Sequence, residues 1–498
     1  MRISIIGSGY GGAIIATLLK KIGHDVVLIE RDSHPKFSIG ESSTPLANFL
    51  LEELGKKYDL PHLYNLSTWG RWQKHHPDIE VGLKRGFSFF FLDDQGNVEN
   101  KETMCVAASP DEQVADTHWY RPQFDLFLVD QAVKHEVTYL EKTVVESVDF
   151  SEEKLNLSLV ERNHIKKNIK VDYLIDATGN HSFSSEHLSI SESSPHREEG
   201  DRFAVYAHFQ NVSPISNALK KGSISPYPLD DSAIHFLFEG GWIWILRFNN
   251  GIVSAGASIS KFSQLGNLEE EEAPTIWRTL LDRLPAIKKL FSQSQIVTPF
   301  YKSHSLEFIR GPVTGDRWIK LPSSCGFVDP LLSTGFSLNL LGIGRLANFF
   351  LRNENLSEES FMKSYSEKTL GDLQTASSYI KTLLSVSHDS KEFKKLALVY
   401  FIGIIQQEIK SRLNLIPSYS DFLYKQDNDW RALASELLST RYTLDQILEK
   451  LSSWDLGGVL DYPNWMIPAS KNKLLSNCHK IPASKHQIEL MLNEARSL

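Results

Sequence analysis

The opening residues carry the pattern that most constrains the fold. An apolar run over residues 2 to 6 is followed by Gly7, Gly9 and Gly12 in G-x-G-x-x-G spacing, a helical pattern, and a second apolar run that ends at Glu30. In a βαβ unit such glycines allow a tight turn, close approach of the backbone to a pyrophosphate, and close packing of helix on strand. The helix N-terminus meets the phosphates, and Glu30 can accept hydrogen bonds from an adenosine ribose. The pattern predicts a dinucleotide-binding domain; the alternative is a glycine-rich turn beside a solvated Glu30.

Composition narrows the class of protein. The 498 residues are too many for one simple core, so we expect two or three domains. The net charge of −8 implies no basic surface and argues against nucleic acid as a partner. Three distant cysteines, Cys105, Cys325 and Cys478, form neither a metal site nor a disulfide framework, which suits a reducing cytoplasm. The N-terminus does not read as a signal peptide, and the longest apolar run, residues 396–405, is too short for a transmembrane segment.

A short polar segment, GESSTP, occupies residues 40–45. Taken alone, it is a turn that supplies an N-cap for the helical pattern after it. It also resembles the G-E-x-x-x-P signature of the flavin-dependent halogenases, a branch of the FAD monooxygenases with the para-hydroxybenzoate hydroxylase fold. The resemblance implies that the cofactor is FAD and that Glu41 and Ser42 lie along it.

Two further segments resemble elements of the wider fold. WYRPQFDLFL, residues 119–128, matches R-x-x-F-D-x-x-L. The match implies that Arg121 approaches the cofactor and that Asp125 caps the following helix; the alternative is an ordinary helix start with an ion pair. VDYLIDATGN, residues 171–180, looks like the D-A-x-G turn of that fold, which implies that the chain returns here to the FAD-binding domain near the adenine end.

The segment GGWIWILRF places two tryptophans at a spacing of two. Because side chains alternate along a strand, Trp242 and Trp244 are predicted to share one face. They are either a core aromatic pair or a partial match to the halogenase signature G-W-x-W-x-I-P, in which Arg247 replaces the proline. In that family the tryptophans form a crowded wall by the flavin, which disfavours direct hydroxylation of the substrate.

Residues 315–340 resemble the second segment that contacts the flavin in the halogenase family. The resemblance implies cofactor contacts at Asp329, Gly335 and Phe336. It departs from the family at Ser323, which stands where an aspartate is usual.

Within this segment, Thr334 and Gly335 open a predicted helix, whose free N–H groups can hold an anion. In the resembling halogenases that anion is the halide. A helix start that contacts flavin without binding halide is the alternative.

Lys84 stands at the head of an aromatic strand, GFSFFF. As part of a K-x-G element it resembles the halogenase lysine between flavin and substrate, which polarises hypohalous acid or forms a haloamine with it. A compact ammonium whose pKa shifts on desolvation suits this catalytic role. The residues leave two alternatives: a charge that protects a sheet edge from pairing, and an anchor for an acidic substrate.

The substrate class follows from the neighbours of that lysine. Phe87 and Phe89 are predicted to share a strand face and, with Trp242 and Trp244, to line a pocket for a flat aromatic molecule. Leu332 occupies the position where tryptophan halogenases carry a glutamate. Without that carboxylate we expect a self-activating ring, namely a phenol, resorcinol or pyrrole, free or tethered to a carrier protein.

These patterns together predict an α/β protein, α+β overall. The expected parts are a discontinuous Rossmann-like FAD-binding domain (1–85, 118–185 and 298–350), an inserted antiparallel substrate sheet (86–117 and 186–297) and a helical C-terminal region (351–498). The expected function is a halogenase that uses FADH2, O2 and chloride or bromide. No metal is expected, and a separate NAD(P)H-dependent flavin reductase supplies the reduced flavin. A FAD-dependent monooxygenase or oxidoreductase without halogenation, and a flavin-binding protein without turnover, are the alternatives.

Overall fold

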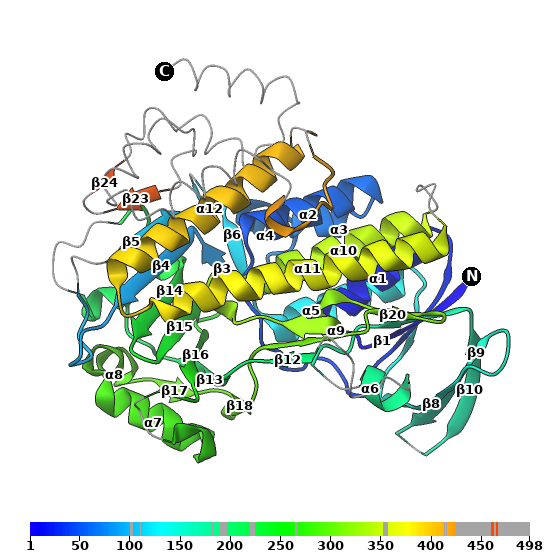
Figure 1. The fold of residues 1–498 in the computed structure, drawn as a ribbon, viewed down its shortest axis with the longest axis horizontal. Coiled ribbons are helices and arrows are strands. Elements are labelled where there is room, and N and C mark those ends of the chain that lie inside the picture. The colour runs from blue at the N-terminus through cyan, green and yellow to red at the C-terminus, as the bar shows by residue number, and fades with distance from the viewer. Residues whose placement is uncertain are drawn as a thin grey trace.

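A computed structural model represents the protein, and Figure 1 shows its fold. It describes residues 1–99, 103–109, 111–162, 164–180, 183–188, 197–219, 225–263, 267–351, 357–412, 414, 416–424, 460–462 and 465–466. Within these residues, no helix combines the length and the apolar character that a membrane crossing needs.

The predicted Rossmann-like unit is a six-stranded sheet in the order β20-β21-β11-β1-β2-β7. Its strands are β1 (Arg2–Ile6), β2 (Asp25–Ile29), β7 (Thr138–Leu140), β11 (Tyr173–Asp176), β20 (Thr314–Gly315) and β21 (Trp318–Lys320). All neighbours are parallel except β20 and β21. The central strands are mainly apolar because both faces are covered. Helices α1 (Tyr10–Lys21), α5 (Arg121–Lys134) and α10 (Gly335–Phe350) pack together on one face.

A three-stranded antiparallel sheet covers the other face. It consists of β8 (Thr143–Asp149), β9 (Leu155–Glu161) and β10 (Lys166–Val171). Leu155, Leu157 and Leu159 alternate with more exposed residues along β9 and join a core that includes Val27 of β2 and Leu174 of β11. The period-two pattern therefore buries one face of this small sheet and leaves the other to solvent.

The second large unit is a ten-stranded sheet in the order β17-β13-β16-β15-β14-β4-β5-β23-β24, with β18 also pairing with β13. Its strands are β4 (Gly86–Phe91), β5 (Met104–Ala107), β13 (Arg202–Gln210), β14 (Ala233–Phe238), β15 (Gly241–Arg247), β16 (Val253–Ser260), β17 (Gln295–Ile296), β18 (Tyr301–Ser303), β23 (Leu460–Tyr462) and β24 (Trp465–Met466). The expected antiparallel sheet is present with one difference: β4 and β14 are parallel. Smaller pairings join β3 (Val81–Lys84) to β6 (Asp116–Trp119), and β12 (Arg197–Glu199) and β22 (Gly326–Phe327) to β19 (Phe308–Arg310).

The two faces of this sheet have separate cores. Phe90 belongs to a cluster with Phe236 and Ile243, which α7 (Ala273–Arg283) and α8 (Pro285–Phe291) cover. The opposite face carries Phe87 and Phe89 toward the core that is shared with the Rossmann-like unit. Figure 1 shows α7 and α8 at one end of the molecule and the β8–β10 sheet at the other.

The remaining helices surround the junction of the two units. They are α2 (Pro45–Lys57), α3 (Pro61–Asn65), α4 (Trp69–His75), α6 (Phe183–His187), α9 (Pro322–Cys325), α11 (Glu358–Ser385) and α12 (Ser390–Arg412), with 3-10 turns at Ile215–Asn217, Leu229–Asp231, Leu268–Glu270, Pro330–Leu332 and Phe422–Tyr424. The long helices α11 and α12 confirm a helical C-terminal region up to residue 412 (Figure 1). Strands β23 and β24 are a departure from that expectation, since β23 adds to the edge offered by β5.

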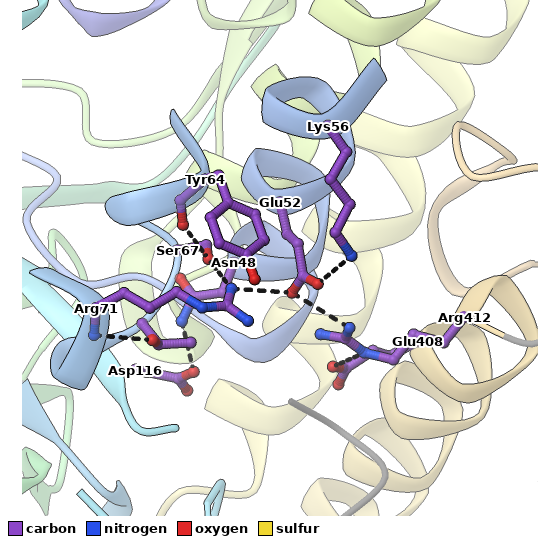
Figure 2. Close-up of polar contacts among 10 residues, drawn as sticks. Asn48, Glu52, Lys56, Tyr64, Ser67, Arg71, Asp116, Glu408 and Arg412 are labelled. Carbon is purple, nitrogen blue, oxygen red and sulfur yellow. Dashed lines mark hydrogen bonds and ion pairs between the residues drawn. The ribbon is translucent and has the colours of Figure 1, made fainter. Parts of the chain in front are cut away.

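A buried ion network fixes α2 against α4 and α12 (Figure 2). Glu52 of α2 is paired with Lys56 in the same helix, with Arg71 of α4 and with Arg412 of α12. Arg412 also pairs with Glu408 at 3.0 Å. Because α2 begins at Pro45, the last residue of the GESSTP segment, this network also fixes the helix that follows from that segment.

Candidate active site

One cavity of about 670 Å³ lies where the two large sheets meet. Ten of the predicted site residues line it: Gly7, Gly9, Glu30, Glu41, Ser42, Arg121, Trp242, Trp244, Gly335 and Phe336. Seven do not: Gly12, Lys84, Phe87, Phe89, Asp329, Leu332 and Thr334. Residues from five separate segments thus face a single space.

The glycine-rich turn is tightly packed against neighbouring backbone at Gly7 and Gly12, and its backbone is accessible from the cavity at Gly9. Gly7 has φ +100°, and a Cβ there would lie 2.6 Å from the Ala177 carbonyl oxygen. A Cβ on Gly12 would lie 1.9 Å from the carbonyl oxygen of Gly7. At Gly9 the nearest atom to such a Cβ is 3.8 Å away, on Asp125. The turn therefore leaves free approach to its backbone at Gly9, as a bound pyrophosphate requires.

Glu30 is held as a carboxylate at the end of β2. Its Oε2 accepts hydrogen bonds from the backbone N and Oγ of Ser8, both at 2.9 Å, and pairs with Lys36 at 2.7 Å. Burial raises the pKa of Glu30, but Lys36 and the N–H groups of Ser8 and Asp32 outweigh it and lower the pKa to about 2. Glu30 was predicted from the glycine motif, but its partners Ser8 and Lys36 were not. Lys36 belongs to a loop without a recognisable sequence pattern.

Arg121 forms a bidentate ion pair with Asp125 within helix α5. Both nitrogen–oxygen distances are 2.7 Å, and the NH1 group donates to the carbonyl oxygens of Ile39 and Gly40. The prediction that Asp125 caps this helix is wrong, since Asp125 lies four residues inside it and binds the arginine one turn earlier. The structure agrees with the alternative, a helix start with an ion pair. This ion pair with Asp125 fixes Arg121 on the cavity wall.

The GESSTP segment connects both sheets. Glu41 accepts a hydrogen bond from Nε2 of His208 on β13, at 2.8 Å, and both side chains are buried. Thr44 caps α2 through the backbone N of Ala47, which confirms the predicted N-cap. Thr44 also hydrogen-bonds Ser337 of α10 at 2.8 Å. The segment is therefore anchored at its two ends while Ser42 faces the cavity.

Lys84 is fully buried beside that segment. Its Nζ donates to Ser42 Oγ at 3.0 Å and to the Ser43 carbonyl oxygen at 2.6 Å, and lies 3.7 Å from the centre of the Phe87 ring. Burial lowers the pKa of Lys84 well below its usual value. A charge that protects a sheet edge must reach solvent, and Lys84 does not. Its partner Ser42, rather than the lysine itself, lines the cavity.

The phenylalanines next to Lys84 are covered by helix α12. Phe87 contacts Phe401 at a ring distance of 5.2 Å, and Phe89 contacts Phe393 at 5.4 Å. These two phenylalanines were predicted to line a substrate pocket, and here their rings pack against α12 and do not line the cavity.

Trp242 and Trp244 lie side by side on the cavity wall, on one face of β15 as predicted. Their rings are 5.6 Å apart. The Trp242 indole N–H donates to Asp329 Oδ1 at 3.1 Å, and Ser258 Oγ donates to Asp329 Oδ2 at 2.6 Å. Asp329, which was predicted to contact the cofactor, thus orients the tryptophan from behind. Leu332 is buried in the turn after Asp329.

The start of helix α10 forms a cradle at the cavity. Ser333 has φ +54°, and a Cβ on Gly335 would have no neighbour within 4 Å. The Oγ1 of Thr334 is buried and, within the described residues, has no hydrogen-bond partner. Because the first N–H groups of a helix also lack partners in the helix, this end offers several donors to an anion. Ser323 lines the same cavity, so the residue in place of the usual aspartate still faces it.

Comparisons with known proteins agree with this architecture. The family of NAD(P)-binding Rossmann-like domains matches residues 5–44. The chain is 28% identical over 368 residues to monodechloroaminopyrrolnitrin halogenase PrnC of Pseudomonas fluorescens. This alignment covers 72% of this chain and 63% of that enzyme. It is 24% identical over 373 residues to a Pseudomonas fluorescens chlorinase of 1H-pyrrole-2-carbonyl groups on a peptidyl-carrier protein, covering 72% and 78% of the two chains.

The fold is similar to the crystal structure of halogenase PltM. The TM-score is 0.77 at 22% sequence identity, and the superposition covers 98% of this chain and 99% of that chain. The predicted resemblance to flavin-dependent halogenases and the predicted fold class are confirmed. The chain spans 63% of the length of PrnC, which is less than two thirds.

Proposed function

We propose that this chain is a FAD-dependent halogenase that installs chloride or bromide on an electron-rich aromatic ring through hypohalous acid and Lys84. The observation that supports it most is the buried amine of Lys84, bound to Ser42 and Ser43 of the segment that walls the cavity. The relatives with halogenase names agree with this chemistry.

The cavity fits FAD. The open backbone at Gly9 and the N-terminus of α1 suit the pyrophosphate, and the ionised Glu30 suits the adenosine ribose. Arg121 and Ser42 would lie along the rest of the cofactor. Reduced FAD held by these residues would supply the two electrons for the reduction of O2, which is the chemistry needed to oxidise a halide to hypohalous acid with release of water.

The halide would be held at the start of α10. The backbone N–H groups of Gly335 and Phe336 and the Oγ1 of Thr334 are the donors available there. The absence of a Cβ at Gly335 leaves room for an ion as large as chloride or bromide.

Lys84 would act on the hypohalous acid. The two hydrogen bonds from Nζ fix the amine, and its burial strengthens any hydrogen bond it donates. Because burial lowers the pKa of Lys84, the group can give up a proton and regain it within one turnover. An ammonium that donates to the oxygen of hypohalous acid makes hydroxide a better leaving group and directs the halogen to one carbon.

The acceptor would be a phenol, a resorcinol or a pyrrole. Leu332 supplies no carboxylate to activate a poor ring, so the ring must supply its own electrons. The relative that acts on a pyrrole group carried by a protein supports a carrier-tethered acceptor, and a free acceptor is the alternative. The sequence contains no second G-x-G-x-x-G motif, which supports a separate NAD(P)H-dependent flavin reductase as the source of reduced flavin.

The test is product mass with and without halide. The enzyme is given FAD, a flavin reductase, NADH, oxygen and resorcinol, in buffer with bromide or without any halide. We expect a brominated product only with bromide. A product that gains one oxygen atom in either buffer would instead show a monooxygenase and refute the proposal.

The role of Lys84 is tested by Lys84→Met, which keeps the length of the side chain. We expect halogenation to be lost while FAD binding, followed by flavin absorbance, is retained. Lys320→Met is the matched control, because Lys320 is also a buried lysine but lies in β21 of the Rossmann-like sheet, whereas Lys84 is bound to Ser42 and Ser43. Normal halogenation by Lys84→Met, per bound flavin, would remove Lys84 from the mechanism.

A further inference from the structure

His235 lies on the cavity wall and has no part in the function proposed so far. It belongs to β14, where its register partners are Phe89 on β4 and Trp244 on β15. Its ring stacks on Phe89 with centres 4.6 Å apart and lies 5.3 Å from the Trp242 ring. Only 2% of its surface is exposed, so its plane is fixed on both sides while its edge reaches the cavity.

Its hydrogen bond determines which nitrogen carries the proton. Nδ1 lies 3.3 Å from the carbonyl oxygen of Ser88. A carbonyl oxygen can only accept, so Nδ1 is the donor, and in a neutral imidazole Nε2 is then the nitrogen that carries no proton. Burial and the charge of Lys84 lower the pKa of His235 to about 3, so the ring is neutral near pH 7.

No carboxylate of the described cavity wall can serve as a base on this side. The acidic residues that line the cavity are Glu30, Glu41 and Glu186. Glu30 is occupied by Ser8 and Lys36, Glu41 is paired with His208, and Glu186 belongs to α6 in the Rossmann-like unit. His235 is the basic group of the wall formed by β14 and β15, next to both tryptophans.

We propose that His235 is the general base that takes the hydroxyl proton of a phenolic acceptor during halogen transfer. This inference rests on the proposed function and specifies its acceptor as one that carries an ionisable hydroxyl.

The proposed step balances. A ring carbon attacks the halogen of hypohalous acid, the carbon–halogen bond forms, and the oxygen–halogen bond breaks with its electrons on oxygen. The Lys84 ammonium protonates that oxygen, and water leaves. Nε2 of His235 takes the acceptor's hydroxyl proton, which leaves a neutral ring ketone. The ring proton then returns to the Lys84 amine and the imidazolium returns its proton to the ketone oxygen, giving the halophenol.

The two proton transfers favour each other electrostatically. The positive charge of Lys84 opposes protonation of both His235 and the neighbouring His118. When Lys84 gives its proton to the leaving oxygen, that repulsion disappears and the basicity of His235 rises. The histidine is thus a weak base in the resting enzyme and a stronger one in the step that needs it.

The experiment compares two acceptors, resorcinol and resorcinol dimethyl ether, with wild type, His235→Phe and His235→Gln. The ether has no hydroxyl proton to lose, so a base cannot help it. We expect both variants to lose about 100-fold or more in kcat/KM on resorcinol, a typical effect of losing a general base. We expect no change on the ether, and no change in hypohalous acid captured by a diffusible trap.

His62→Phe is the control for loss of a buried histidine. His62 is also buried, with its pKa lowered to about 3, but it lies outside the cavity lining. It should leave the ratio of the two acceptor rates unchanged. His235→Gln, which can accept a hydrogen bond but cannot take a proton, keeps the test open if the phenylalanine variant does not fold.

Each outcome decides. Equal losses on resorcinol and the ether, or no loss on resorcinol, overturn the role of His235 while the proposed function stands. A wild-type enzyme that yields neither halogenated product nor trapped hypohalous acid overturns the proposed function, and the inference falls with it.

Discussion

Glu52→Gln should weaken the link between α2 and α12 that Figure 2 shows. The substitution keeps the volume of the side chain and removes its charge. Glu52 is 1% exposed and faces three cations: Lys56, Arg71 at 3.4 Å and Arg412 at 3.4 Å. Removing one partner of a buried ion pair costs about 3–5 kcal/mol, because the other charge stays buried without compensation.

The structure places the effect at the lower end of that range, about 3 kcal/mol. The Lys56 side chain is 47% exposed and can be solvated by water once its partner is gone. Arg412 keeps its ion pair with Glu408 at 3.0 Å. Arg71, at 16% exposure, also keeps a hydrogen bond to Ser67.

The cost should depend on pH in a definite direction. Burial raises the pKa of Glu52, but Arg412, Lys56 and Arg71 outweigh it and the pKa is lowered from 4.5. A lowered folded-state pKa means that the stabilisation is complete above 4.5 and is lost as pH falls through the folded pKa. The difference in stability between wild type and Glu52→Gln should therefore be full at pH 7 and shrink in acid.

Urea unfolding at several pH values, followed by circular dichroism and by tryptophan fluorescence, measures both effects. Asp59→Asn is the control, since the pair of Asp59 with Lys21 is 89% and 36% exposed and should contribute at most about 1 kcal/mol. If Glu52→Gln costs no more than this control at pH 7, or costs the same at every pH, the buried network does not hold α12 as described.

Three further predictions concern the site. Gly12→Ala should cost about 1–3 kcal/mol and reduce flavin binding, because its Cβ would lie 1.9 Å from the Gly7 carbonyl oxygen; unchanged flavin absorbance after gel filtration would contradict this. The free energy that Glu30 contributes to folding should be present above its usual value of 4.5 and be lost as pH approaches its folded pKa of about 2. Urea titrations of wild type and Glu30→Gln that differ equally at all pH values would disprove that coupling. Trp242→Phe leaves the buried Asp329 without an indole N–H donor and should cost about 1–3 kcal/mol; a urea midpoint equal to wild type would show that the bond is dispensable.

Features that depend on neighbouring residues could be read from the sequence. The glycine spacing identified the turn, because the closest contact that a Cβ at Gly12 would make is with the carbonyl oxygen of Gly7, within the same turn. The period of two placed Trp242 and Trp244 on one face, and the helix that begins at Gly335 was predicted from its own residues. The relation between Arg121 and Asp125 was misread as a cap, since spacing alone does not show which of two partners a carboxylate will bind.

The tertiary structure alone decided where the functional groups meet. Lys84 is held by Ser42 and Ser43, which lie about forty residues earlier in the chain. His235 reaches the cavity that Ser42 lines because β14 pairs with β4, which lies far away in sequence. Such contacts depend on how sheets and helices pack, and local residue patterns contain no information about packing between distant segments. The sequence by itself therefore determined the kind of site, and folding determined which side chains share it.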